Sequence, residues 1–385
     1  MSWMKGFAMA QCCEKCFSDG YLLDYIRQNG HVGTCDYCES DNVLCVSTDN
    51  MTSLFEPLIA LFKPAERETQ YTLADRLSDY WNIFADYEYG SETISRLLDE
   101  IRPHEVEAGG MFTFSDAARD HESGEDWSIK DEYRDIKLWE DFARGIVSEN
   151  RFFLKDNSIY DMLREIGDKA SAKINVDNVL YRGRIAESNL NIAYYHKEHM
   201  FAPPPDKAPA GRANVEGIPV LYASSDKDTI IAEVRAWVGA HITIASMKPR
   251  RELHVVDFTN HACFGSPFCQ DDLTHTFCLM RLMRELDKAF ARPFSSSDGK
   301  IHYVPTQYVA SYFKNAGYDG IRYRSAMNPT GYNVALFDGE DAVQVGDLIY
   351  VKVNRVSYDT SEYVPWFLRP GVKLTLPDPF KKTRK

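Results

Sequence analysis

The sequence predicts an α+β protein in which a cysteine-rich N-terminal module and a helical middle region precede a C-terminal domain of mixed β-strands. Two C-x2-C pairs predict the first part, and apolar residues at helical spacing from about residue 51 to 165 predict the second. After residue 175 the pattern changes to short strands separated by short helices. We therefore expect domains at 1–48, 49–165 and 166–358 and a tail at 359–385, in a chain of 385 residues.

The cysteines are concentrated at the N-terminus, where the first 45 residues hold six of the nine. The segments CEKC and CDYC are two C-x2-C pairs separated by 18 residues, a spacing typical of a four-thiolate zinc ribbon. We predict structural zinc at Cys13, Cys16, Cys35 and Cys38, with Cys12 as an alternative to Cys13. Disulfides are the other interpretation, and a reducing cytosol disfavours them. Four thiolates leave no open coordination position, so this zinc would stabilise the module without taking part in catalysis.

The charge and the hydrophobic pattern limit the class of partner. A formal net charge of −13 disfavours a general nucleic-acid scaffold, which needs a positive field. The chain contains no apolar run of about 18 residues and no signal-type N-terminus. We expect a cytoplasmic protein that does not engage a membrane.

The helical middle region is predicted from three segments: TLADRLSDYWNIF, SETISRLLDEI and IKDEYRDIKLWEDFARGIV. A fourth helix, NSIYDMLREIGDKAS, leads into the last domain. Strands are predicted at NVLYRGRI, PVLYAS, ELHVVDF, DGIRYRS, YNVALFD and DLIYVKVNRV. The proline-rich segment 201–217 is expected to form an exposed loop.

Residues 217–237, GIPVLYASSDKDTIIAEVRAW, predict a strand followed by a helix. Ser225 and Asp228 have the spacing of a capping box, so we expect the helix to begin near Asp226.

The same helix carries a glutamate on its apolar side. At about 100° per residue, Ile230, Val234 and Trp237 share one face, and Glu233 lies on its flank. A carboxylate in that position is costly unless a donor satisfies it. Glu233 is therefore either an interhelical salt-bridge partner or a group held for chemistry.

Polar residues also follow the late strands. Strand alternation sets Arg182 and Arg184 opposite Tyr181, and it sets Tyr323 and Ser325 on one face. Strand arginines usually form ion pairs, and a serine at a strand end usually forms a turn. The sequence contains no G-x-G-x-x-G, phosphate-loop lysine, H-E-x-x-H or G-x-S-x-G motif, so the commonest nucleotide, metalloprotease and serine-hydrolase sites are excluded.

Five segments occur in a characteristic order: LYRGR, GRANVEGIPVLYAS, TIIAEVRAW, PTQYVASYFKNAGYDGIRYRS and YNVALFD. Together they cover roughly residues 175–355 and resemble the RES-domain family, named for an arginine, a glutamate and a serine. That family is similar in fold to ADP-ribosyltransferases, and its members consume NAD, typically as bacterial toxins. The resemblance implies an ADP-ribosyltransferase-like C-terminal domain that takes NAD as its substrate.

By match of motif, the resemblance implies that the three residues are Arg182, Glu233 and Ser325. It also implies NAD-binding roles for Tyr222, which closes the strand before the helix, and for Arg212 in the loop that begins with Gly211. The family's loop often reads G-R-aromatic-N, whereas here it reads GRAN and lacks the ring.

These residue types suit cleavage of the bond between nicotinamide and ribose. Nicotinamide leaves from a positively charged ring, so one carboxylate, Glu233, can stabilise the oxocarbenium charge without a general acid. Arg182 would pair with the pyrophosphate in a planar, bidentate manner. Tyr222 offers an aromatic face for nicotinamide, and Ser325 a hydroxyl for its amide or the neighbouring ribose.

Three functions remain open from the sequence. The first is an NAD glycohydrolase or phosphorylase in a toxin–antitoxin or phage-defence setting, with an antitoxin or trigger protein as partner. The second is a mono-ADP-ribosyltransferase whose acceptor is a protein or nucleic acid. The third is a zinc-ribbon interaction protein that binds a nucleotide without turning it over. Release of nicotinamide separates the third from the other two.

Overall fold

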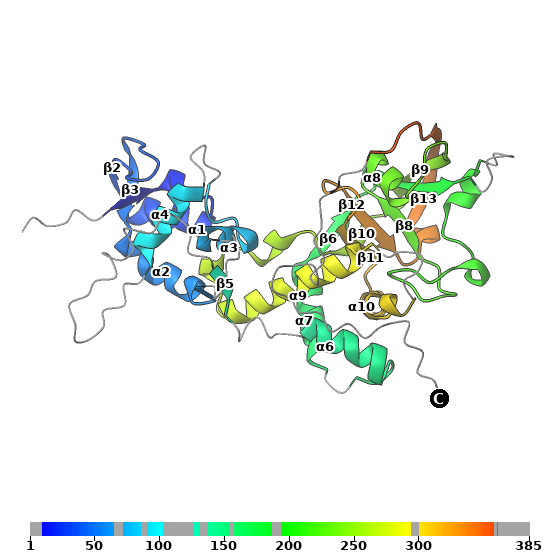
Figure 1. The fold of residues 1–385 in the computed structure, drawn as a ribbon, viewed down its shortest axis with the longest axis horizontal. Helices are drawn as coiled ribbons and strands as arrows, with labels where there is room; N and C mark the ends of the chain where they lie inside the picture. The colour runs from blue at the N-terminus through cyan, green and yellow to red at the C-terminus, as the bar shows by residue number, and fades with distance from the viewer. Residues whose placement is uncertain are drawn as a thin grey trace, which may run out of the picture.

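The computed structural model describes residues 10–64, 72–85, 91–102, 127–130, 138–154, 157–186, 194–293, 300–357 and 360. Its mixture of helices and sheets, with a cysteine cluster near the N-terminus, confirms the predicted α+β class. In Figure 1 the N-terminal elements form one lobe and the large sheet forms the other, and α9 (Leu273–Ala291) extends between them. The predicted tail at 359–385 lies outside the described residues except for residue 360.

The N-terminal module is built on a small antiparallel sheet of order β1-β3-β2. Its elements are β1 (Gln11–Cys13), η1 (Glu14–Cys16), α1 (Gly20–Asn29), β2 (His31–Gly33), β3 (Val43–Ser47) and α2 (Asp49–Ile59). The Asp19 carboxylate caps α1 by accepting the backbone N–H of Leu22 at 3.1 Å, which satisfies one of the otherwise unpaired N–H groups at the helix start.

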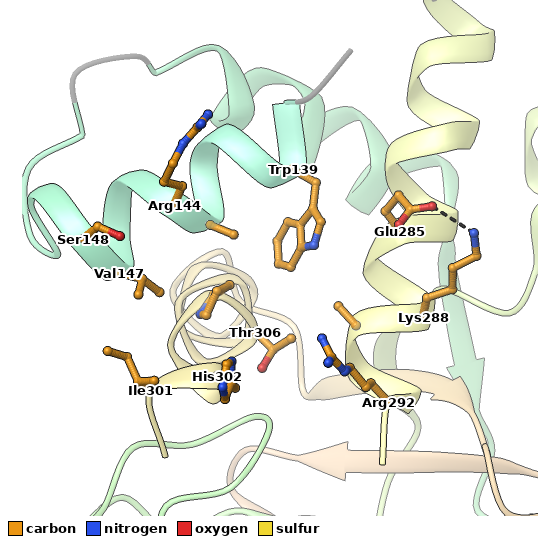
Figure 2. Close-up of a pocket in the computed structure, with 13 residues that line it drawn as sticks. Trp139, Arg144, Val147, Ser148, Glu285, Lys288, Arg292, Ile301, His302 and Thr306 are labelled. Atoms are coloured by element: carbon orange, nitrogen blue, oxygen red, sulfur yellow. Dashed lines mark hydrogen bonds and ion pairs between the residues drawn. The ribbon is translucent and has the colours of Figure 1, made fainter. Parts of the chain in front are cut away.

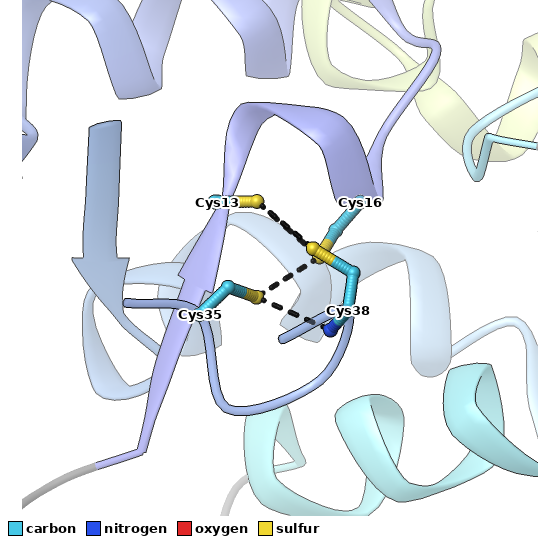
Figure 3. A group of neighbouring side chains, drawn as sticks. All are labelled: Cys13, Cys16, Cys35 and Cys38. Carbon is cyan, nitrogen blue, oxygen red and sulfur yellow. Dashed lines mark hydrogen bonds between the residues drawn. The ribbon is translucent and has the colours of Figure 1, made fainter. Parts of the chain in front are cut away.

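The four predicted thiols come together in this module (Figure 3). The Sγ atoms of Cys13, Cys16, Cys35 and Cys38 all lie within 4.8 Å of one another. The Sγ of Cys12 instead contacts the carbonyl of Val46 at 3.7 Å. Of the two cysteines that the sequence offered as the first ligand, Cys13 is therefore the one in the cluster. All nine cysteines fall within the described ranges and are free thiols. The cluster has the donor set of a closed tetrahedral thiolate site.

The middle region contains a helix within each predicted segment and one small sheet that was not predicted. The third segment was predicted to be helical from Ile129, but Ile129 ends a strand, and its residues 131–137 lie outside the described residues. The helices are α3 (Leu73–Tyr80), α4 (Ser91–Ile101), α6 (Leu138–Arg144), the π-helical turn η2 (Gly145–Glu149) and α7 (Ser158–Lys169). The sheet pairs β4 (Phe62–Pro64) with β5 (Trp127–Ile129), which lie too far apart in the sequence for a local turn signal to indicate their pairing.

The C-terminal part is an eight-stranded sheet of order β13-β9-β7-β8-β12-β11-β10-β6. Its strands are β6 (Ser171–Ile174), β7 (Leu180–Ile185), β8 (Leu221–Ser224), β9 (His241–Pro249), β10 (Leu253–Asp257), β11 (Gly320–Arg324), β12 (Tyr332–Leu336) and β13 (Val343–Lys352). The connecting helices are η3 (Lys197–Met200), η4 (Pro205–Lys207), α8 (Lys227–Glu233), η5 (His261–Phe264), η6 (Pro267–Cys269), α9, η7 (Lys300–Tyr303), α10 (Val304–Asn315) and α11 (Gly339–Ala342). The pairs are antiparallel except for β10 with β11.

Six of these strands match predicted segments, and β6 and β9 were not predicted. The sequence of β9, HITIASMKP, alternates only over the short stretches HITI and SMK, with a break between Ile244 and Ala245, and residues 242–245 are all buried. The strand β6 has only four residues and follows α7 almost directly. Both strands depend on neighbours in the sheet more than on a local pattern.

The register of the sheet aligns polar residues across four strands. Tyr323 lies opposite Asn333, Asn333 opposite Ser224, and Ser224 opposite Tyr181. Opposed residues point to the same face of a sheet, so these four side chains form a row on one face.

A continuous core joins the two lobes. Phe277 of α9 is fully buried, with its ring centroid 5.7 Å from that of Phe62, 4.8 Å from Tyr80 and 5.7 Å from Trp81. Buried side chains from the N-terminal module, the middle region and one face of the large sheet belong to the same cluster. The predicted domain boundaries at residues 48 and 165 stay a prediction. Apolar side chains on both sides of each boundary pack in the same cluster. Within the described ranges, no helix combines the length and the apolar character needed to span a bilayer.

We predict that zinc copurifies at about one ion per chain, because four convergent thiols match the preferred ligand set of this metal. Cys13→Ser combined with Cys38→Ser should remove it, as measured by elemental mass spectrometry. Cys12→Ser is the control and should keep the zinc, since its Sγ contacts a carbonyl outside the cluster. Unchanged zinc in the double variant would show that the ligand assignment is wrong.

Phe277→Ala should lower the free energy of unfolding by about 3–5 kcal/mol, because it opens a cavity among packed aromatic rings. Chemical denaturation measures the change. Phe153→Ala is the matched control, since that ring is 77% exposed and its loss should change stability by less than about 0.5 kcal/mol. Equal effects of the two substitutions would contradict a shared core around α9.

Candidate active site

Glu233 is the last residue of α8. The Asp226 carboxylate caps this helix by accepting the backbone N–H and the hydroxyl of Thr229 at 2.8 and 2.7 Å, so the predicted start is confirmed. The predicted cap at Ser225 is wrong by one residue, because the hydroxyl of Ser225 donates to Asp226.

The helix is also shorter than predicted. It ends at Glu233, and Arg235 adopts a left-handed conformation with φ of 49°, which no α-helix can continue through. Trp237 therefore lies beyond the helix and is 52% exposed, so it shares no core-facing stripe with Ile230. Glu233 is presented from a helix end and does not lie on the flank of a long amphipathic helix.

The Glu233 carboxylate is held by two neutral donors. Its Oε1 accepts the Ser325 hydroxyl at 2.6 Å and the Asn333 side-chain amide at 2.8 Å. Throughout the ranges that the structure describes, Glu233 forms no ion pair with a Lys, Arg or His. The salt-bridge interpretation is thus not supported, and the carboxylate is compensated by hydrogen bonds.

Ser325 follows β11 and is 4% exposed. Its Oγ accepts the backbone N–H groups of Met327 and Asn328, each at 3.1 Å, while its proton goes to Glu233. A hydroxyl has one donor and two acceptor positions, so Ser325 is fully hydrogen-bonded in this arrangement.

The turn after Ser325 packs tightly on α8. The Asn328 amide donates to the Thr229 hydroxyl at 2.9 Å. A Cβ at Gly331 would lie 1.9 Å from the same hydroxyl oxygen, so only glycine allows this approach. The turn and the helix are thereby fixed to each other on either side of the Glu233–Ser325 bond.

Arg182 lies in β7 and reaches toward β8. Its Nη1 donates to the carbonyl of Tyr222 at 2.7 Å, and its buried Nε has no partner among the described atoms. The strands β7 and β8 pair only at Tyr181 and Ser224, which leaves room for the guanidinium beside β8. Burial, with a further contribution from Arg184, lowers the pKa of Arg182 to about 10. The group is therefore still protonated at neutral pH.

Tyr222 and the loop after Gly211 form one hydrogen-bonded unit. The Tyr222 hydroxyl accepts the backbone N–H of Ala213 and donates to the Asn214 side chain, both at 2.8 Å. The Gln307 amide donates to the carbonyls of Gly211 and Asn214 at 2.9 and 2.8 Å. Burial raises the pKa of Tyr222 above its usual range, so its hydroxyl keeps its proton.

This loop corrects one prediction in part. Segment 201–217 was expected to be an exposed loop, and residues 204–207 and 215–217 are exposed, but Ala213 is only 5% and Asn214 only 6% exposed. Side-chain bonds from Tyr222 and Gln307 compensate its polar groups and permit this burial.

Arg212 projects from the same loop. Its Nη2 donates to the carbonyl of Arg292 at 3.1 Å, and its buried Nε has no described partner. Burial raises the pKa of Tyr323 to about 12, an effect that the Arg212 guanidinium opposes and the Glu233 carboxylate reinforces. Arg212 and Glu233 thus both act on the same phenol.

The predicted residues therefore form two groups linked by β8. Glu233 and Ser325 touch directly, whereas Arg182 and Arg212 surround Tyr222 and its loop. No described contact joins either arginine to Glu233. Sequence reasoning missed Asn333 and Ser224, whose side chains bond at 2.7 Å, although a polar residue in the apolar segment YNVALFD was a usable signal.

A cavity of about 460 Å³ lies near this region, between α6, α9 and α10 (Figure 2). Trp139, Lys288, Arg292 and Thr306 are among its lining residues, and no predicted site residue lines it. Arg292 links it to the site, since its carbonyl accepts the Arg212 guanidinium. The cavity is thus a neighbour of the candidate site and not part of it.

Comparison with known proteins gives a solved structure and a family. One chain in the MbcT–MbcA toxin–antitoxin complex of M. tuberculosis is 13% identical to this chain with a TM-score of 0.28; the alignment covers 50% of this chain and 92% of that one. No curated protein matches the sequence. The family model for the RES domain matches residues 184–359.

That match includes Arg212, Tyr222, Glu233 and Ser325, and it begins two residues after Arg182. The motifs and the matched range agree, and residues 184–359 of this chain are a RES domain.

Proposed function

We propose that the RES domain binds NAD and cleaves the bond between its nicotinamide and ribose. The observation that carries this proposal is the carboxylate of Glu233, held at the end of α8 by Ser325 and Asn333 and compensated by neutral donors only. A carboxylate kept without a cationic partner retains its full negative charge for a cation that develops nearby.

The chemistry requires little else at the reacting carbon. Nicotinamide leaves as a neutral base from a pyridinium ring, so the bond breaks without protonation of the leaving group. Glu233 stabilises the resulting oxocarbenium charge. Water then adds to the ribose carbon and loses one proton, which gives ADP-ribose, nicotinamide and a proton; with phosphate as acceptor the product is the ribosyl phosphate.

Two arginines support the binding of the pyrophosphate. Arg182 and Arg212 each keep a buried Nε without a described partner, and buried polar groups normally have one. In our proposal the pyrophosphate supplies these partners, since guanidinium groups pair with phosphate in planar geometry. Tyr222 connects the two arginines, because its carbonyl holds Arg182 and its hydroxyl holds the loop of Arg212.

The acceptor decides between hydrolysis, phosphorolysis and ADP-ribosylation of a protein or nucleic acid. Incubation of the purified chain with NAD, followed by mass analysis of the products, separates these reactions. If NAD is bound and no nicotinamide forms, the chain is a nucleotide-binding module. We further propose that loss of NAD makes the active chain toxic and that an antitoxin or trigger protein controls it.

Glu233→Gln should lower kcat for nicotinamide release by roughly 10²-fold or more while NAD still binds, because the lost charge acts mainly in the transition state. Release is measured by chromatography and binding by calorimetry. Glu216→Gln is the control, since its exposed carboxylate pairs with Lys300 and contacts none of the proposed catalytic residues. A folded Glu233→Gln protein that releases nicotinamide at the wild-type rate would remove Glu233 from the mechanism.

Arg182→Ala should raise KM for NAD by about tenfold or more and change kcat much less, because a pyrophosphate contact exists before the bond breaks. Arg184→Ala is the matched control. That arginine lies two positions along the same strand, where it donates to the carbonyl of Phe201 and stacks over Tyr195. The same rise in KM for both variants would indicate a general effect on β7.

A further inference from the structure

We propose that Asn333 is a positioning residue that fixes Glu233 through one carboxylate oxygen and leaves the other oxygen for the substrate. This inference rests on the proposed function and assigns a role to a residue that lies outside the arginine, glutamate and serine of the family name.

The first step is the geometry at Glu233. Both of its described hydrogen bonds end on Oε1, at 2.6 Å from Ser325 and 2.8 Å from Asn333. No described side chain donates to Oε2. Two donors on one oxygen fix the rotation of the carboxylate, so Oε2 has a set direction in which to meet a hydroxyl of the ribose.

The second step is the orientation of the Asn333 amide. An ionised carboxylate only accepts hydrogen bonds, so the NH2 of Asn333 must face Glu233 and its Oδ1 must face the other way. The Ser224 hydroxyl donates to that Oδ1 at 2.7 Å, which stabilises the same orientation of the Asn333 amide. Asn333 is 5% exposed, so its amide is largely shielded from solvent.

The third step is the rigidity of the backbone. Asn333 lies in β12 with Tyr323 of β11 on one side and Ser224 of β8 on the other. Pairing on both sides fixes its Cα position. The side-chain amide of Asn333 therefore holds Glu233, at the end of α8, in a fixed position relative to the sheet.

The fourth step concerns Ser325, whose hydroxyl has no remaining hydrogen-bond capacity. It donates to Glu233 and accepts two backbone N–H groups, those of Met327 and Asn328. In this arrangement Ser325 acts through Glu233 in the same way as Asn333. A direct bond from Ser325 to nicotinamide or ribose, as the sequence suggested, requires one of these bonds to break.

The kinetic test compares three variants of the full chain in nicotinamide release. Asn333→Ala should lower kcat by roughly tenfold or more with KM within about twofold, because a hydrogen bond to a charged group is lost. Aspartate has the same size as asparagine but no donor, so Asn333→Asp should lower kcat at least as much as Asn333→Ala. If Asn333 only filled space, Asn333→Asp would keep the wild-type kcat. Ser224→Ala keeps the bond to Glu233 and should lose less, about threefold.

Asn178→Ala is the matched control. The Asn178 side chain accepts the backbone N–H of Asn175 in an exposed turn before β7 and has no described bond to Glu233, Ser325 or Asn333, so kcat should stay at the wild-type value. Thermal transitions establish that each variant is folded.

A spectroscopic test needs no turnover. The side-chain amide signal of Asn333, assigned by its loss in Asn333→Ala, should shift in Glu233→Gln, because its acceptor loses its charge. The amide signal of Asn178 should not move.

The outcomes separate the two proposals. If the Asn333 signal shifts in Glu233→Gln but the wild-type chain releases no nicotinamide from NAD, the positioning contact is supported and the proposed function is refuted. An Asn333 signal that does not respond to Glu233→Gln overturns the inference, as does wild-type kcat in folded Asn333→Asp.

Discussion

The hydrogen-bonded carboxylate of Glu233 is the interaction on which the geometry of the RES domain depends. It joins the end of α8 to the turn after β11 and to β12, whose contacting residues lie 92 and 100 positions further along the sequence. Neither Ser325 nor Asn333 carries charge, so the contact connects these segments without neutralising the carboxylate. A salt bridge at this position would have held the same elements together and removed the negative charge that a ribosyl cation needs.

The helix α9 connects this centre to the N-terminal lobe. Near its start, Phe277 packs on aromatic rings of the middle region. Near its end, the buried carboxylate of Asp287 accepts both the backbone N–H and the guanidinium of Arg324, the residue directly before Ser325. The N-terminal lobe and the residue that holds Glu233 therefore share one rigid element.

Much of the architecture was predictable because it depends on local patterns. The C-x2-C pairs predicted the thiol cluster, since each pair places two sulfurs close together and the spacing of the pairs is typical of a zinc ribbon; the small sheet brings the two pairs together. Helical spacing predicted α4 and α7, and alternation predicted β7, β8 and β12. The sequence also marked Glu233 and Ser325, because a carboxylate beside an apolar stripe and a serine at a strand end were each unusual enough to examine.

Other features depend on residues that are distant in the sequence, and no local pattern indicates them. The alternation in β9 is interrupted at Ile244 and Ala245, and the end of α8 is set by a left-handed turn at Arg235 that periodicity alone does not reveal. The partnership of Asn333 with Glu233 exists because the sheet places β12 between β8 and β11. The sequence by itself determined which groups are available for chemistry, namely a carboxylate, two arginines and a cluster of thiols. Only the tertiary structure decided which of them touch, because hydrogen bonds across about a hundred residues depend on strand order and register.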